Sequence, residues 1–184
     1  EGESGKITCE KIKSSELPPI KNYVSISSDG EIGGILNGMA FGTGPNSAFY
    51  ISKIDEKIKE ILAGVEIKKI GFDLKKDWRI LDEKKATLEG MAFDVQLAAY
   101  LLKSGSNLSW EDLVMQELGV MIEKEGKKPG QAALIFQEDE KEFEKICRRA
   151  ALNFALKEKL EKRLEEISSE QIEEGREKTI KNLF

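Results

Sequence analysis

Histidine is absent from the 184-residue sequence. This absence excludes a histidine-ligated zinc site, a Ser-His-Asp triad and a Cys-His nucleophile pair. Any catalytic group must therefore be a carboxylate or the side chain of a lysine, tyrosine, cysteine or serine.

Cysteine is scarce, and so are long apolar runs. Cys9 and Cys147 lie far apart and form no CxxC motif, as expected for plain thiols in a reduced compartment. No apolar run approaches the roughly 20 residues of a membrane helix, and the charged, glycine-rich N-terminus is unlike a signal peptide. We therefore predict a cytoplasmic protein with two reduced thiols and no membrane partner. Because Glu1 is not a methionine, we also expect a piece of a longer chain.

The composition, 40% hydrophobic and 34% charged, is ordinary for a globular protein and sufficient for one core. The net charge of −5 argues against tight autonomous binding to duplex DNA, because compact readers of duplex DNA are usually basic. We predict a polar, strand-poor lead-in over residues 1–20, one domain over 21–167 and a charged tail over 168–184.

Apolar periodicity and capping residues predict a mixed order of elements. Strands are expected at 23–27, 35–41, 48–51, 67–71 and 88–93, the first three as an antiparallel meander. Helices are expected at 53–63 after Ser52, after Asp73, at 94–103 after Asp94, after Ser109 up to Gly119, and at 138–167. Turns or loops are expected at Asp29-Gly30 and 42–46, and a mobile loop at 123–131. This order predicts an α/β fold in which a mixed sheet is flanked by helices.

Two segments carry a family resemblance. Residues 69–81, KIGFDLKKDWRIL, resemble the second exonuclease motif of family-A DNA polymerases, in which a strand runs into N-L-K-x-D and a helix. Residues 88–102, LEGMAFDVQLAAYLL, resemble that family's G-x-x-F-D-x-x-L-x-x-Y-L-L segment, and residues 36–41 resemble its second strand. The resemblance implies a ribonuclease-H-like, DnaQ-like exonuclease fold and a bacterial DNA polymerase I as the parent protein.

The chemistry of that family depends on clustered acids. A D-x-E on the first strand, an Asp in the second motif and a Y-x-x-x-D on a late helix hold two divalent metals. One metal activates the attacking water, and the pair stabilises the in-line displacement at the 3′-terminal phosphodiester.

The resemblance maps these positions onto a depleted set. Ser27 stands in place of the first Asp, Asp29 in place of the Glu, and Asp77 matches the Asp of the second motif. Cys147 stands in place of the Tyr and Ala151 in place of the late Asp. Asp29 and Asp77 are thus the remaining candidates for metal ligands, and we expect no cofactor in this domain.

Each of these residues also has an ordinary structural interpretation. Asp77 suits a solvated acid on a helix surface beside Lys75 and Lys76, and Asp29 suits a turn before Gly30. Cys147 suits a small buried apolar residue.

A basic run could touch a nucleic-acid backbone. Lys75, Lys76 and Arg79 are the main candidates for such contacts, although nearby acids make a solvated surface the more common outcome. The full run consists of Lys68, Lys69, Lys75, Lys76, Arg79, Lys84 and Lys85.

The resemblance therefore implies a vestigial 3′–5′ exonuclease-like domain of a DNA polymerase I. It would serve DNA replication and repair as a structural module, with the polymerase domain of the same chain as its partner and weak contact with DNA. Two alternatives stay open: an active nuclease that uses Mg²⁺ or Mn²⁺, and a free-standing interaction domain.

Overall fold

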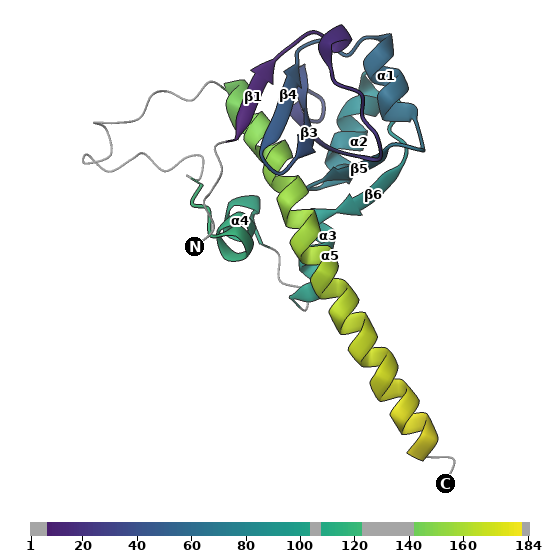
Figure 1. The fold of residues 1–184 in the computed structure, drawn as a ribbon. Coiled ribbons are helices and arrows are strands. Elements are labelled where there is room, and N and C mark those ends of the chain that lie inside the picture. Colours follow the sequence, from purple (N-terminus) through teal and green to yellow (C-terminus); the bar gives the residue numbers. More distant parts are fainter. Residues whose placement is uncertain (1–6, 104–107, 123–141, 182–184) are drawn as a thin grey trace, which may run out of the picture.

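A computed structural model of the chain describes residues 7–103, 108–122 and 142–181, with side chains up to Ile167 (Figure 1). The loop predicted at 123–131 and residues 138–141 of the predicted long helix lie outside this description. The strands are β1 (Thr8–Lys11), β2 (Tyr23–Gly30), β3 (Leu36–Gly44), β4 (Ser47–Ile51), β5 (Lys68–Gly71) and β6 (Met91–Asp94). The helices are α1 (Glu56–Ala63), α2 (Leu74–Glu83), α3 (Val95–Leu102), α4 (Trp110–Leu118) and α5 (Glu142–Lys181). None of the helices in these ranges is long and apolar enough to cross a bilayer.

The six strands form one mixed sheet in the order β1-β4-β3-β2-β5-β6. Strands β2, β3 and β4 pair antiparallel, so the predicted meander is confirmed. Strand β5 joins β2 in parallel, and β6 joins β5 in parallel. The predicted mixed sheet with flanking helices is therefore the observed architecture.

The alternation of side chains along the strands gives the sheet two unlike faces. One face carries large apolar side chains, such as Val24, Ile26 and Phe41, which pack against α1 and α2. The opposite face carries small residues, among them Ala40 and Ala48, and is covered by α5. Figure 1 shows α5 crossing this second face as one continuous helix.

Helix α5 lies unusually close to the sheet at Gly42. A Cβ atom at Gly42 would stand 2.7 Å from the carbonyl oxygen of Ala150 and 3.2 Å from the amide nitrogen of Ala151. These are backbone atoms of a packed helix, so they have little room to move. Gly42 therefore sets the distance between the helix and the sheet.

We expect Gly42→Ala to destabilise the fold by about 1–3 kcal/mol, the usual cost of overpacking a tight contact. The matched control is Gly44→Ala in the same strand, where an added Cβ meets no atom within 4 Å. The control should stay within about 0.5 kcal/mol of the parent. Urea unfolding of the three proteins measures the difference, and equal midpoints for the two variants would contradict the close approach.

The lead-in predicted to be strand-poor contributes an edge strand. Strand β1 pairs in parallel with β4, with Cys9 opposite Ala48 and Lys11 opposite Tyr50. Residues 8–11 show too little alternation of apolar and polar residues to indicate a strand. Their pairing partner, β4, lies far away in the sequence, so no local pattern reveals the strand. The limits of the domain itself remain a prediction.

One predicted turn is wrong and another is shorter than predicted, because the strands continue into both segments; the second turn is made by Pro45 and Asn46. Strand β2 passes Asp29 and Gly30 with a bulge, and the reversal follows at residues 31–34, where the amide of Gly34 donates to the carbonyl of Glu31 at 3.0 Å. Strand β3 extends to Gly44, past most of the loop predicted at 42–46. Glycine-rich strand ends therefore resembled turns in the sequence.

Three element boundaries also differ from the prediction. Helix α1 begins after Asp55, whose side chain accepts from the amide of Ile58, and not after Ser52. Strand β6 begins at Met91, later than the predicted 88. The backbone of α5 stays helical to Lys181, through most of the segment predicted as a tail. The helix starts at Asp73, Asp94 and Ser109 and the helix end at Gly119 are confirmed.

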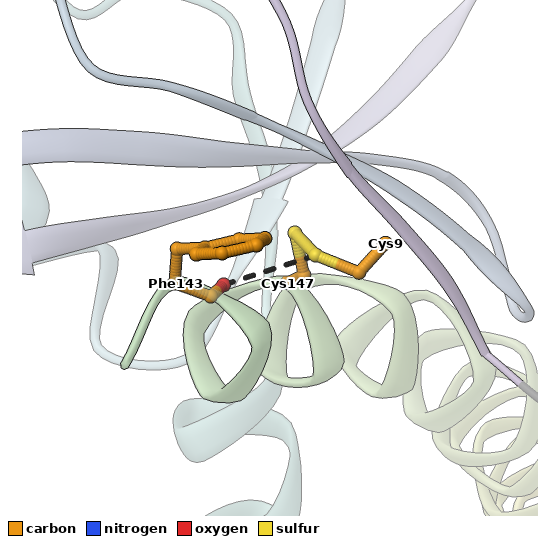
Figure 2. Close-up of a disulfide and its surroundings, with 3 residues drawn as sticks. All are labelled: Cys9, Phe143 and Cys147. Atoms are coloured by element: carbon orange, nitrogen blue, oxygen red, sulfur yellow. Dashed lines mark hydrogen bonds between the residues drawn. A yellow bond between two sulfur atoms is a disulfide. The ribbon is translucent and has the colours of Figure 1, made fainter. Parts of the chain in front are cut away.

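The prediction of two plain thiols is wrong in this structure. Cys9 of β1 and Cys147 of α5 form a disulfide, with their Cα atoms 5.8 Å apart (Figure 2). The Sγ atom of Cys9 also lies 3.9 Å from the carbonyl oxygen of Phe143. This contact can be a hydrogen bond only when the disulfide is reduced, because only the thiol has a hydrogen to donate. The separation of 138 residues hid the pair, because proximity across a sheet is not visible in sequence spacing.

Candidate active site

Asp94 fixes the start of α2 and therefore the position of Asp77. Its carboxylate caps α3 by accepting from the amide of Gln96 at 2.9 Å, and it also accepts from the amide of Leu74 at 2.7 Å. Asp73 begins α2 in a left-handed conformation and accepts from the amide of Lys76 at 3.2 Å. One carboxylate thus joins two helix starts at the end of the parallel strands.

Asp77 points into the protein, so the interpretation as a solvated surface acid is wrong. The residue is 6% exposed, and its Oδ1 accepts from the amide of Ser28 on β2 at 3.1 Å. Burial raises the pKa of Asp77 to about 6, although hydrogen bonding from Ser28 and the charge of Arg149 oppose the shift. A carboxyl of this kind is a functional-site candidate and also a destabilising buried charge.

Asp29 is held by a phenol that the motif comparison did not include. The hydroxyl of Tyr50 on β4 donates to Oδ2 of Asp29 at 2.6 Å, and the amide of Asn37 reaches Oδ1 at 3.4 Å. Burial and the neighbouring carboxylate raise the pKa of Tyr50. Asp29 is therefore a bonded strand residue and not the predicted turn residue. Strand alternation from Ala48 would have placed Tyr50 on this face.

The remaining mapped positions lie where α5 packs on the sheet. Ser27 pairs across the sheet with Ala40, which packs in one cluster with Tyr50, Cys147 and Ala151. Ser27 is 6% exposed, and Cys147 and Ala151 are fully buried. The contact between α5 and the sheet thus buries Ser27, Cys147 and Ala151 together.

Arg149 of α5 places a positive charge near Asp77. The guanidinium of Arg149 stacks 5.3 Å from the ring centroid of Phe72 and 5.5 Å from that of Trp110. Helix α4 is tied to α5 in the same region, since Nε1 of Trp110 donates to Asn153 at 2.8 Å. Arg149 thus carries positive charge close enough to lower the pKa of Asp77.

The acids around β2 do not suit a pair of divalent metals. Hard cations need several oxygen ligands, yet Ser27 and Ala151 bring no carboxylate. Within residues 7–103, 108–122 and 142–167, no three acids or other ligating side chains are grouped so that they could hold a metal. Asp29 and Asp77 are each occupied by hydrogen-bond donors of the chain.

The basic candidates separate into two kinds. Lys75, Lys76 and Arg79 are exposed on α2 and accessible to a polyanion. Lys69 is fully buried, bonds to the carbonyl of Gly64 and has its pKa lowered to about 8 by burial, so its inclusion in a nucleic-acid surface is wrong. Lys69 instead caps the end of α1.

One known protein family matches part of this chain. Residues 33–122 match the family described as "DNA polymerase I, ribonuclease H-like domain". The matched range includes Asp77 and Asp94 but neither Ser27 on β2 nor the α5 positions. No match is found among curated proteins.

Solved structures share the fold at low sequence identity. NrnC of Brucella melitensis bound to pGG is 20% identical with a TM-score of 0.68, and the alignment covers 90% of this chain and 84% of that one. The POL domain of Pol1 from M. smegmatis is 20% identical with a TM-score of 0.62, covering 79% of this chain but 24% of that one. RNase D of Escherichia coli is 16% identical with a TM-score of 0.51, covering 82% and 38%. The chain therefore has a ribonuclease-H-like α/β fold, and its residues 33–122 are similar to the ribonuclease H-like domain of DNA polymerase I.

Proposed function

We propose that this domain is a vestigial 3′–5′ exonuclease module of a DNA polymerase I that no longer proofreads. The observation that carries the proposal is the packing at Gly42, where the backbone of Ala150 and Ala151 lies directly on the sheet. Ala151 stands where the family supplies its late Asp. The α5 face therefore holds methyl groups where the nuclease mechanism needs a carboxylate facing solvent.

The chain's own groups explain why partial activity is not expected. Two-metal hydrolysis needs both ions together, one to generate hydroxide and both to stabilise the transition state. Asp29 is bonded to Tyr50, and Asp77 is buried beside the charge of Arg149. Each carboxylate is therefore already engaged by groups of the chain itself.

The retained role is structural, with DNA contact as a secondary function. The Pol1 relative, of which this chain spans about a quarter, supports a polymerase domain as the partner within the parent chain. Lys75, Lys76 and Arg79 on α2 supply the candidate contacts to a phosphate backbone. This role belongs to DNA-templated synthesis in the cytoplasm.

An active nuclease is the second candidate function. NrnC of Brucella melitensis, which shares the fold at 19% identity, has been solved with bound Mg²⁺. In this chain Asp29 and Asp77 would be the ligands, with Mg²⁺ or Mn²⁺ as the cofactor. A nuclease assay with added metal therefore distinguishes the two candidate functions: the vestigial domain leaves DNA intact, and the active nuclease shortens it.

We expect the purified chain to leave 3′-labelled single-stranded DNA undegraded in Mg²⁺ or Mn²⁺. Ser27→Asp or Ala151→Asp alone should also be inactive, because each restores one ligand of a centre that works as a unit. The combination of Ser27→Asp, Asp29→Glu, Cys147→Tyr and Ala151→Asp is the repair variant to compare. Metal-dependent shortening by the unmodified chain, abolished by Asp77→Ala, would replace the vestigial proposal with the nuclease alternative.

A further inference from the structure

Strand β1 forms one edge of the sheet and buries little surface of its own. Of its four residues only Cys9 is partly buried, and the strand pairs with β4 alone. The amide of Thr8 donates to the carbonyl of Asn46 at 2.8 Å. The amide of Ile12 donates to the carbonyl of Tyr50 at 3.0 Å. An edge strand with so little buried surface belongs to the part of a protein that opens most readily.

The disulfide is the strongest link between β1 and α5. Cys147 is fully buried in α5, and its Sγ atom is bonded to that of Cys9 (Figure 2). Lys11 adds a weaker contact, since its Nζ atom lies 5.6 Å from the ring centroid of Tyr50 and 6.0 Å from that of Phe143. Cation–π contacts of an exposed lysine contribute little. The covalent bond therefore decides whether β1 can leave the sheet.

The two cysteines differ in their access to a reductant. Cys9 is partly exposed, whereas Cys147 is fully buried, so a thiolate from solution attacks at Cys9. The attack forms a mixed disulfide with Cys9, and Cys147 leaves as a thiolate that takes up a proton. The second thiol of a dithiol reductant then displaces Cys9. The reductant thereby loses two electrons and two hydrogens and becomes a disulfide, and a disulfide oxidant reverses the exchange.

We propose that β1 is a redox-controlled strap on the edge of the sheet. In the oxidised chain the bond between Cys9 and Cys147 keeps β1 paired with β4. In the reduced chain β1 detaches locally, while the other strands and α5 stay folded. The hinge lies directly after the strand, where Ile12 and Leu17 pack against the large apolar core between the sheet, α1 and α2.

Opening of the strap changes the edge that the sheet presents. The carbonyls of Asn46 and Tyr50 lose their donors from β1, so β4 becomes the edge strand, with backbone groups free to pair with another strand. Lys11 also leaves the ring of Tyr50, whose hydroxyl donates to Asp29. The switch does not depend on whether the domain has nuclease activity, because none of its steps involves a metal.

Amide hydrogen exchange of the full 184-residue chain, followed by NMR at several low urea concentrations, tests the strap. In the reduced chain the amides of Thr8 and Ile12 should exchange at least about tenfold faster than those of the β2–β3 ladder. Their rates should not depend on urea, because local opening exposes little surface. Oxidation should slow both amides at least about tenfold. The control, Cys9→Ser with Cys147→Ser, should match the reduced chain with or without a reductant.

Thiol labelling gives a second measurement that needs no substitution. In the reduced parent, iodoacetamide should modify Cys9 first and then the buried Cys147, at a rate that low urea leaves unchanged. Three results would overturn the proposal. They are no disulfide after treatment with a disulfide oxidant, exchange of Thr8 and Ile12 in the reduced chain with the rate and urea dependence of the β2–β3 ladder, and labelling of Cys147 that accelerates with urea as global unfolding does.

Discussion

Reduction of the Cys9–Cys147 disulfide is expected to lower the free energy of unfolding by about 5 kcal/mol. The bond closes a loop between residues 138 apart in the sequence, and the chain-entropy account of cross-links gives roughly this value for a loop of such length. The effect is a large fraction of the stability of an ordinary domain. Urea unfolding with and without a phosphine reductant measures it.

The control is the Cys9→Ser, Cys147→Ser double variant. Its stability should match that of the reduced parent and should not respond to the reductant. Two reactive thiols in the parent denatured without reductant would contradict the pairing. In any reducing compartment the bond would be open, and the lower stability would then be the relevant one.

Asp77→Asn is expected to stabilise the protein at neutral pH by up to about 3 kcal/mol. The folded pKa of Asp77, about 6, lies above the ordinary value of 3.8, since burial disfavours the charged form. The folded state therefore binds more protons between pH 4 and pH 6, and its stability falls as the pH rises through that window. Asn removes the buried charge and keeps an oxygen to accept from Ser28.

The pH dependence separates this explanation from a general effect of the substitution. The stability difference between Asp77→Asn and the parent should be small at pH 4, grow up to pH 6 and stay constant above it. Asp82→Asn, at an exposed position of the same helix, should differ little from the parent throughout. A destabilised Asp77→Asn at pH 7 would show that the carboxylate has a favourable structural or ligand-binding role.

The sequence was most informative where the structure depends on local chemistry. Asp73, Asp94 and Ser109 begin helices because their side chains accept from amides within the next three residues. Alternation of apolar and polar residues along 23–27 and 48–51 predicted two strands of the meander. Their pairing could also be predicted, because consecutive strands are joined by short connections. The motif resemblance then led to the ribonuclease-H-like fold.

The sequence was least informative where distant segments meet. Strand β1 depends on its pairing with β4 at the far edge of the sheet. The disulfide joins two residues that are 138 positions apart in the sequence. The burial of Asp77 was missed because neighbouring lysines at 75 and 76 suggested a solvated helix face. The hydrogen bond from Tyr50 to Asp29 becomes visible only once β4 and β2 are aligned on either side of β3.

Calorimetric titration of the unmodified chain with Mn²⁺ tests the central claim most directly, because a two-metal exonuclease must bind its metals. We predict no saturable binding that distinguishes the parent from Asp77→Ala, since Ser27 and Ala151 supply no charge and Asp29 and Asp77 are engaged by Tyr50 and Ser28. Two equivalents of Mn²⁺ bound by the parent, and lost in Asp77→Ala, would contradict the account.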